Sequence, residues 1–221
     1  MSTTPNNDAV KTDSPDRALL VIDIQNDFTP GGALEVPRGD EIVPLVNQIA
    51  ATFRNVVQAQ DWHPAGHISF ASSHPGKEPY DIIELPYGPQ VLWPDHCIQG
   101  SHGAEFHPGM NLPHTQLIVR KGGNPLVDSY SAFYEADQQT TTGLAGYLRE
   151  KAIKTVYVVG LALDFCVAWT ALHARREGFA TYVVLDACRA IDNDGSLENA
   201  MNEMLRAGVV FIESRQLLGN A

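Results

Sequence analysis

Six short apolar runs, most of them rich in β-branched residues, constrain the fold of this chain more than any other feature. Within each run, apolar residues follow one another and do not alternate with polar ones, which is typical of strands covered on both faces in a parallel sheet. The runs occupy residues 18–22, 55–59, 116–119, 155–159, 181–185 and 209–212. We therefore predict a six-stranded, mostly parallel sheet.

Segments with helical spacing of apolar residues lie between these runs, at residues 40–53, 142–151, 164–177 and 196–207. Thr142 is a candidate N-cap, and Gly178 and Gly208 directly follow the last two segments, at the position where helices commonly end. Strands that alternate with helices of this length indicate βαβ units. The predicted fold class is therefore α/β, a doubly wound sheet with helices on both faces.

The length of 221 residues and the 44% hydrophobic content predict a single domain over residues 17–221. It follows a polar N-terminal tail, residues 1–16, that we expect to be disordered. The net charge is −11 and no run of Lys or Arg is present, so neither nucleic acid nor a membrane is an expected partner. Three cysteines without a CxxC pair, and no apolar leader segment, favour a cytoplasmic protein without a disulfide framework.

Chemically capable side chains stand at the ends of four predicted strands: Asp23, Asp61, Lys121 and Cys166. Ligands of open α/β sheets bind in the crevice beyond the carboxyl ends of the strands. The long stretch over residues 64–113 is rich in Pro, Gly and His, and a loop of that length usually has a function. The sequence therefore predicts a site at this edge of the sheet.

Cys166 is the candidate nucleophile, because it lies in the first turn of the helix predicted after residues 155–159. The positive end of a helix lowers the pKa of a thiol. Taken singly, each residue has a simpler interpretation: a buried small side chain for Cys166, a turn cap for Asp23 and a solvated cation for Lys121. Cys97 and Cys188 lack the helix-start setting, and we interpret both as structural.

A second group of candidate residues could hold a metal ion. Asp61 and His63 stand at i and i+2 of an extended segment and therefore on the same side of it. Together with His96 they would form a two-histidine, one-carboxylate site with open positions, whose donors suit Zn, Fe or Mn. An isolated DxH pair usually has no metal. His67 and His74 are further candidates, and the other histidines are interpreted as surface or hydrogen-bonded: His102, His107, His114 and His173.

Taken together, these segments resemble the nicotinamidase branch of the isochorismatase-like cysteine hydrolases. The matching stretches are VIDIQNDFTPGGAL from Val21, AQDWHPAGHISFAS from Ala59, LWPDHCIQGSHGAEFHP from Leu92, KGGNPLVDSYSAFYE from Lys121 and VVGLALDFCV from Val158. The likeness extends from about Leu19 to the C-terminus. Five motifs in the same order make it specific.

The resemblance implies a role for each candidate. Asp23, Lys121 and Cys166 match the family's catalytic triad, and the metal ligands it implies are Asp61, His63 and His96. His67 matches a position that some family members use as an additional ligand, and we place it beside the metal.

The resemblance also implies features of the substrate pocket. A cis peptide bond is expected between Leu161 and Ala162, with the backbone amides of Ala162 and Cys166 forming an oxyanion hole. The implied substrate-binding residues are Phe28, Trp93, Leu161 and Tyr130.

The activity implied by the resemblance is hydrolysis of nicotinamide to nicotinate and ammonia through a Cys166 thioester, with one divalent metal ion (Zn, Fe or Mn) as cofactor. Pyrazinamide is an expected second substrate, and a homo-oligomer is left open. One alternative is an amidase of the same superfamily acting on a carbamoyl or ureido compound, although those branches generally lack the metal site. Another is a catalytically silent ligand-binding protein on this fold. A dinucleotide-binding dehydrogenase is disfavoured, because no GxGxxG follows the first strand.

Overall fold

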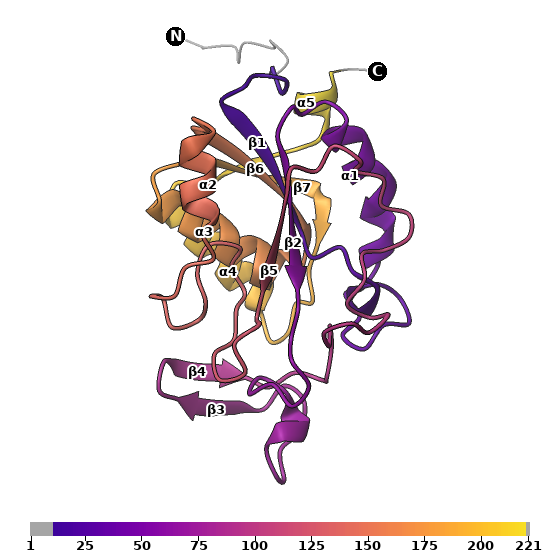
Figure 1. Cartoon of the computed structure of the whole chain (residues 1–221), viewed down its shortest axis with the longest axis vertical. Helices are drawn as coiled ribbons and strands as arrows, with labels where there is room; N and C mark the ends of the chain where they lie inside the picture. The colour runs from indigo at the N-terminus through magenta and orange to yellow at the C-terminus, as the bar shows by residue number, and fades with distance from the viewer. Residues whose placement is uncertain (1–10, 220–221) are drawn as a thin grey trace.

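One six-stranded parallel sheet forms the centre of the computed structural model, which describes residues 11–219 (Figure 1). The strand order is β5-β2-β1-β6-β7-β8. The strands are β1 (Arg17–Ile22), β2 (Val56–Asp61), β5 (Leu117–Lys121), β6 (Thr155–Leu161), β7 (Ala180–Arg189) and β8 (Val210–Ile212). Each of the six predicted runs lies in or at one of these strands, so the predicted fold class is confirmed.

Burial on both faces explains why the runs are unbroken. In β1, Leu19 and Val21 belong to one hydrophobic cluster, whereas Ala18, Leu20 and Ile22 belong to the other. Successive side chains of a strand point to opposite faces, and both faces of this strand are covered.

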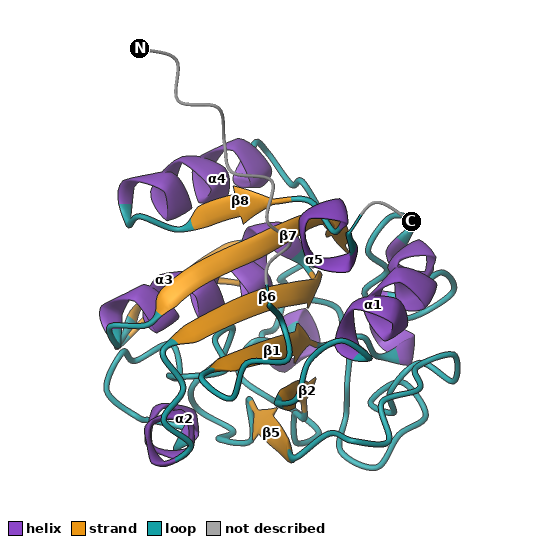
Figure 2. Ribbon diagram, turned by 90° about the horizontal axis from the view of Figure 1, so that it is seen from above, coloured by secondary structure: helices purple, strands orange, loops and turns teal. Residues whose placement is uncertain are grey.

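Two layers of helices cover the sheet (Figure 2). On one face, α1 (Val43–Ala50) and α5 (Arg215–Leu218) contribute to one cluster. On the other face, α2 (Leu144–Glu150), α3 (Ala168–Arg176) and α4 (Ser196–Arg206) contribute to the second. Gly178 and Gly208 follow α3 and α4 with φ of 90° and 79°, the left-handed conformation that favours glycine after a helix. The doubly wound arrangement is therefore the one predicted.

Several predicted boundaries differ from the structure. The helix predicted over residues 40–53 begins as a 3₁₀ turn, Gly39–Ile42, before α1. Thr142 is not the N-cap of α2; Gly143 occupies that position, while Thr142 Oγ1 accepts a hydrogen bond from the Leu144 N–H at 3.2 Å. The segment predicted to start at residue 164 begins with a wider, π-helical turn over Leu163–Val167.

The predicted N-terminal tail is described only in part, because residues 1–10 lie outside the described residues. The carbonyl oxygen of Asp16 accepts hydrogen bonds from the N–H groups of Lys154 and Thr155 at 2.8 and 3.2 Å. The C-terminal end of the predicted tail thus contacts the main fold.

The stretch over residues 64–113 contains structure that the sequence did not predict. It folds into an antiparallel hairpin of β3 (Ile82–Leu85) and β4 (Gly88–Val91), with short 3₁₀ turns at Ala71–Ser73 here and at Asn26–Phe28 after β1. The hairpin lies apart from the main sheet, beyond the carboxyl ends of β2 and β5 (Figure 1). Isolated bridges join Phe70 to Trp93 and His63 to Ile98, so the chain returns from the hairpin to the end of β2.

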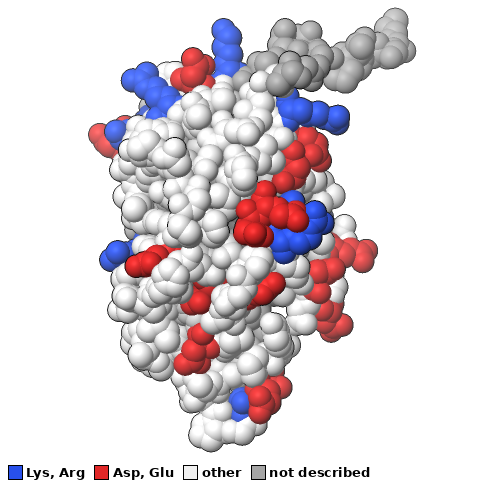
Figure 3. Space-filling model, turned by 90° about the vertical axis from the view of Figure 1, so that its right-hand side faces the viewer, with Lys and Arg blue, Asp and Glu red and all other residues white. Residues whose placement is uncertain are grey.

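None of the helices within residues 11–219 combines the length and apolar character that crossing a membrane requires. On the face drawn in Figure 3, acidic and basic side chains are interspersed, and the basic ones form no continuous patch.

Candidate active site

The four strand-end residues lie together, as their positions predicted. Asp61 and Lys121 are the last residues of the paired strands β2 and β5, and Asp23 directly follows β1. Lys121 Nζ lies 2.9 Å from Asp23 Oδ2, 2.8 Å from Asp61 Oδ1 and 3.4 Å from Cys166 Sγ. All four side chains are buried. Lys121 is therefore the centre of this group.

Lys121 is a buried cation held between two carboxylates. Burial lowers its pKa, but the charges of Asp23 and Asp61 outweigh that effect and hold the pKa well above its usual range. Its ammonium also donates to the Ser129 carbonyl oxygen at 3.0 Å. A buried charge is tolerated only with such partners, so Lys121 stays protonated.

The carboxylate oxygens of Asp23 have fewer hydrogen-bond partners than those of Asp61. Among the described residues, Asp23 Oδ1 has no hydrogen-bond partner, and its Oδ2 has the Lys121 ion pair without hydrogen-bond geometry. Burial raises the pKa of Asp23 to about 6 against the opposing effect of Lys121. A buried carboxylate with an unused oxygen and a raised pKa can accept a proton, as a general base must.

Cys166 lies in the π-helical turn, 7% exposed, and directs its sulfur into the site. Burial raises the pKa of its thiol well above the usual value; Lys121 lowers it, whereas Asp23 and Asp61 raise it further. Burial and the two carboxylates therefore outweigh the charge of Lys121, which favours the thiolate. The resting group is a thiol with a base beside it.

The second predicted group also lies together. His63 Nε2 is 3.1 Å and His96 Nε2 is 3.3 Å from Asp61 Oδ2. His63 Nδ1 donates to the Gly122 carbonyl oxygen at 3.0 Å, and His96 Nδ1 donates to the Pro94 carbonyl oxygen at 2.8 Å. With Nδ1 committed to a carbonyl, Nε2 of each ring faces Asp61 Oδ2, and in the neutral ring this nitrogen offers the lone pair that metal ligation requires. Asp61, His63 and His96 thus form a donor set that could hold one ion.

Asp61 belongs to both groups, because its two oxygens face different partners. Oδ1 accepts from Lys121, and Oδ2 faces the two histidines. Burial raises the pKa of Asp61, but the charges of His63 and Lys121 outweigh it and hold that pKa well below its usual range. Gln25 fixes the backbone here, with Nε2 donating to the Asp61 carbonyl and Oε1 accepting from the Asp61 N–H.

His67 stands beside this donor set, with its own nitrogens engaged elsewhere. Its Nε2 donates to the Asn124 carbonyl oxygen at 2.8 Å, and its Nδ1 lies 2.7 Å from Ser69 Oγ. Its ring centroid is 4.3 Å from that of His63. The expected position beside the ligands fits these contacts, although His63, His67 and Asp128 also form a second set that could hold an ion.

Gly122 makes room for His63. Its φ is +70°, and a Cβ there would stand 2.3 Å from His63 Cε1. Only glycine therefore allows the chain after β5 to turn past the imidazole while its carbonyl accepts from it.

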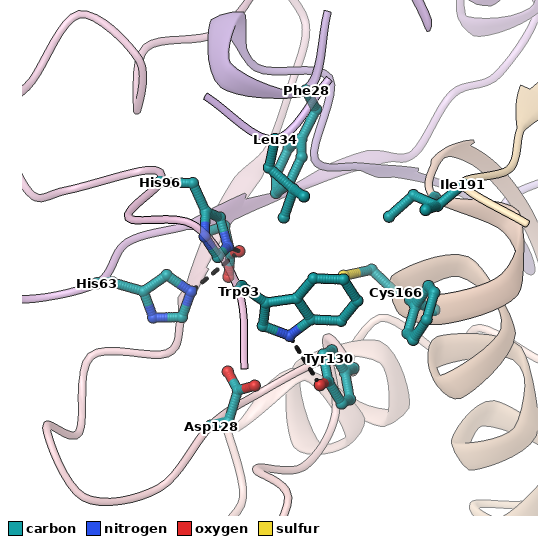
Figure 4. Close-up of a pocket in the computed structure, with 12 residues that line it drawn as sticks. Phe28, Leu34, His63, Trp93, His96, Asp128, Tyr130, Cys166 and Ile191 are labelled. Carbon is teal, nitrogen blue, oxygen red and sulfur yellow. Dashed lines mark hydrogen bonds and ion pairs between the residues drawn. The ribbon is translucent and has the colours of Figure 1, made fainter. Parts of the chain in front are cut away.

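One cavity connects the two groups (Figure 4). Cys166 stands on one side of it, and His63 and His96 stand on the other. Phe28, Trp93 and Tyr130 line it as expected. Trp93 Nε1 donates to Tyr130 Oη at 3.0 Å, which fixes both rings.

Leu161 does not line this cavity, contrary to expectation. It is fully buried in the cluster beneath α1, where a Cβ on Gly39 would lie 3.2 Å from its Cδ1. As the last residue of β6 it points into the core, and its neighbour Ala162 lines the cavity instead. The peptide bond between the two is cis, as expected. The use of the Ala162 and Cys166 amides as an oxyanion hole stays a prediction.

Sequence reasoning missed further lining residues, namely Leu34, Asp128, Phe165 and Ile191. Asp128 is 2% exposed, and its Oδ2 accepts from Gln90 Nε2 at 2.7 Å. It stands in a loop seven residues after the end of β5, so no strand end or periodic pattern marks it.

Comparison with known proteins places these features in a family. A model of the Isochorismatase domain matches residues 17–216. A curated protein named nicotinamidase from Acinetobacter baylyi is 59% identical over 201 residues, which cover 91% of this chain and 94% of that protein.

Comparison with solved structures supports the same family. The structure titled nicotinamidase pyrazinamidase from Acinetobacter baumanii is similar with a TM-score of 0.92 and 60% identity, covering 93% of this chain and 99% of that one. A pyrazinamidase of Pyrococcus horikoshii, solved in complex with zinc, gives a TM-score of 0.75 and 37% identity, with 90% and 99% covered. With its parallel sheet and the matched domain over nearly its whole length, this chain belongs to the isochorismatase family.

Proposed function

We propose that this protein is a metal-dependent cysteine amidohydrolase that converts nicotinamide to nicotinate and ammonia. The observation that carries the proposal is Asp61, which contacts Lys121 beside the candidate nucleophile and also faces both histidines of the candidate metal site. The relatives named nicotinamidase support the substrate. A cavity with aromatic walls, a thiol on one side and imidazoles on the other suits a pyridine ring that carries an amide.

The residues fit a divalent metal ion. Both Nε2 atoms and Asp61 Oδ2 converge, and the remaining ring nitrogens are held by carbonyl oxygens. Nitrogen and oxygen donors suit Zn, Fe or Mn, and the zinc in the Pyrococcus horikoshii structure favours zinc. When bound, the metal supplies a Lewis-acidic position that orients the ring nitrogen of the substrate.

Asp23 and Cys166 perform the chemistry. Asp23 takes the proton of the Cys166 thiol as the sulfur attacks the amide carbonyl carbon, so a stable thiolate is not needed. The oxyanion is received by the N–H groups of Ala162 and Cys166. Asp23 then gives the proton to the amide nitrogen, the C–N bond breaks and ammonia leaves.

Hydrolysis of the thioester completes the cycle. Water attacks the carbonyl carbon while Asp23 takes a proton from it, the C–S bond breaks, and the returned proton restores the Cys166 thiol. Throughout, Lys121 balances the charge of Asp23 and holds it beside the sulfur.

A ureido- or carbamoyl-amidase of the same superfamily is the rival function. It would use Asp23, Lys121 and Cys166 equally well, but it gives no reason for two histidines to converge on Asp61. A catalytically silent binding protein would need neither the three catalytic residues nor the two convergent histidines. Pyrazinamide is the proposed second substrate, and we place the protein in the cytoplasm.

The test is ammonia release by the metal-loaded protein, with nicotinamide, pyrazinamide and an N-carbamoyl amino acid offered separately. We expect release from the first two and none from the third. Release from the carbamoyl compound alone would establish the rival, and no release from any of them would contradict enzymatic function.

A further inference from the structure

The loop over residues 191–195, between β7 and α4, reaches the candidate active site through one side chain. Ile191 lines the same cavity as Cys166, and Figure 4 shows its side chain directed into that cavity. The residues that follow it in the loop are exposed. Asp192 and Asp194 have φ of 55° and 50°, the left-handed region that few non-glycine residues adopt. Such a loop keeps one position only where the surrounding structure holds it.

The carboxylate of Asp164 holds this loop. Oδ1 accepts a hydrogen bond from the Ile191 N–H at 3.0 Å. Oδ2 accepts one from the Asp192 N–H at 2.7 Å and another from the hydroxyl of Ser196, the first residue of α4. Among the described residues, the hydrogen bonds that join residues 191–195 to any part of the fold other than α4 all end on this carboxylate. Asp164 is therefore the polar anchor of the loop.

Asp164 also belongs to the turn that carries the candidate nucleophile. It lies two residues before Cys166 in the π-helical turn Leu163–Val167, and it is only 5% exposed. A buried carboxylate is costly unless hydrogen-bond donors surround it. The three donors here come from the loop and from the positive end of α4. Satisfying this charge therefore ties the loop to the nucleophile turn.

We propose that Asp164 is a positioning residue that holds Ile191 in place as a wall of the cavity that contains Cys166. Asp164 does not itself line the cavity and acts through Ile191. Without the carboxylate, the two loop N–H groups lose their acceptor and turn to water, and the wall moves away. The inference extends the proposed function, but its main test measures access to the thiol and does not depend on the reaction.

Alkylation by two reagents of different size tests the proposal in the full-length protein. Iodoacetamide and its N-phenyl derivative, iodoacetanilide, react at the same carbon, and both require the thiolate. The ratio of their rates at Cys166, followed by mass spectrometry, therefore does not depend on the pKa of the thiol and measures the room around the sulfur.

Asp164→Asn leaves one side-chain oxygen for two N–H donors. It should raise the ratio of iodoacetanilide to iodoacetamide rates by about tenfold, because a hydrogen bond to a charged group is worth about that factor in the population of the closed loop. An unchanged ratio in the folded variant would overturn the proposal.

Ile191→Ala tests whether Asp164 acts through the wall. This variant removes the wall directly and should raise the same ratio. In the double variant, Asp164→Asn should raise the ratio no further, because both changes act on one element of the cavity. Effects that multiply in the double variant would show that Asp164 acts elsewhere, against the proposal.

Asp186→Asn is the matched control. Asp186 accepts hydrogen bonds from the N–H and the hydroxyl of Ser214, the N-cap residue of α5, and it lies outside the cavity. This variant also loses an anchoring carboxylate, so it should lower thermal stability and leave the ratio of alkylation rates unchanged. A rise as large as that in Asp164→Asn would show that the ratio reports general loosening, and the assignment would be wrong.

Hydrogen exchange of the unmodified protein tests the anchor even if Asp164→Asn does not fold. The N–H groups of Ile191 and Asp192 should exchange at least about tenfold more slowly than that of Asp194, after correction for sequence, because the Asp194 N–H has no acceptor among the described residues. Equal exchange rates at the three positions would contradict the anchoring role.

Steady-state kinetics with nicotinamide connects the inference to the reaction, and this reading rests on the proposed function. Asp164→Asn should raise KM more than it lowers kcat, because a displaced wall weakens substrate binding. A lower kcat at unchanged KM would count against the wall. If the unmodified protein releases no ammonia, the proposed function fails, whereas the alkylation ratio still decides this inference.

Discussion

The nucleophile group (Asp23, Lys121 and Cys166) and the metal group (Asp61, His63 and His96) lie in contact but are positioned in different ways. The nucleophile group stands at the ends of β1 and β5 and in the turn after β6, so the sheet fixes all of it. The metal group takes only Asp61 from a strand; His63 follows β2, and His96 returns from the far side of the hairpin.

This difference has a consequence for how each group tolerates change. Buried charges hold the nucleophile group together, so removing one charge alters the ionisation of the others. Backbone carbonyls orient the histidines of the metal group. Substitutions in this group should therefore weaken metal binding by misplacing the ligand atoms. Variants that damage one group while sparing the other test the distinction.

The largest effect is expected for Cys166→Ala. The thiol forms the proposed thioester, so its loss should lower the rate of ammonia release by roughly 10⁴-fold or more while the fold is kept. Metal content, measured by elemental analysis, should stay unchanged. Cys97→Ala and Cys188→Ala are matched controls and should stay active. A folded Cys166→Ala protein with normal activity would end the covalent mechanism.

The next largest effect is expected for His63→Ala and His96→Ala. Losing one of three protein ligands should weaken metal binding by more than about 100-fold, since loss of an outer partner alone costs 10–100-fold. Both variants should purify metal-poor. Alkylation of Cys166 by iodoacetamide should change little, because neither histidine touches the sulfur. A fall in the alkylation rate of Cys166 as large as the fall in metal affinity would show that the two groups are not separable.

A smaller effect is expected for Gly122→Ala, which removes no ligand atom. A methyl group would overlap His63 and the backbone would be strained at φ +70°, so metal affinity should fall by about 10–100-fold. Gly123→Ala is the matched control, because a Cβ there has nothing within 4 Å. Metal titration of the two purified variants compares them. Equal metal affinity in the two variants would show that Gly122 is not needed to make room for His63.

The smallest effect is expected in the pH profile of Cys166 alkylation in the metal-free protein. Because the pKa of this thiol is raised, the rate should still be rising above pH 9. Lys121 lowers that pKa and Asp23 raises it, so Lys121→Met should move the profile to higher pH and Asp23→Asn to lower pH. Shifts in the same direction for both variants would refute the charge arrangement described here.

The sheet could be predicted from the sequence because its signal is local. Unbroken apolar runs marked all six strands, and the residues that follow them marked Asp23, Asp61 and Lys121. Parallel strands end at one edge, so placing three side chains at three ends was enough to place them together.

The remaining features depend on contacts distant in sequence. The β3–β4 hairpin lies outside the main sheet, with Ile82 exposed and only Gln90 of its strand residues buried, so no apolar face marks it in the sequence. Asp128 enters the cavity from a loop, and Leu161 leaves it because strand alternation turns its side chain to the core. His173, interpreted as a surface or hydrogen-bonded residue, is hydrogen-bonded to Gln138 as expected, but it is also buried, among residues from distant segments.

The central claim is that both groups act on one substrate in one cavity. The most direct test compares kcat/KM for nicotinamide and benzamide, which lacks the ring nitrogen, before and after chelation of the metal. Our account predicts a strong preference for nicotinamide in the metal-loaded protein, which disappears on chelation and returns when the metal is restored. A metal-free protein that hydrolyses nicotinamide at the full rate and keeps its preference over benzamide would contradict it.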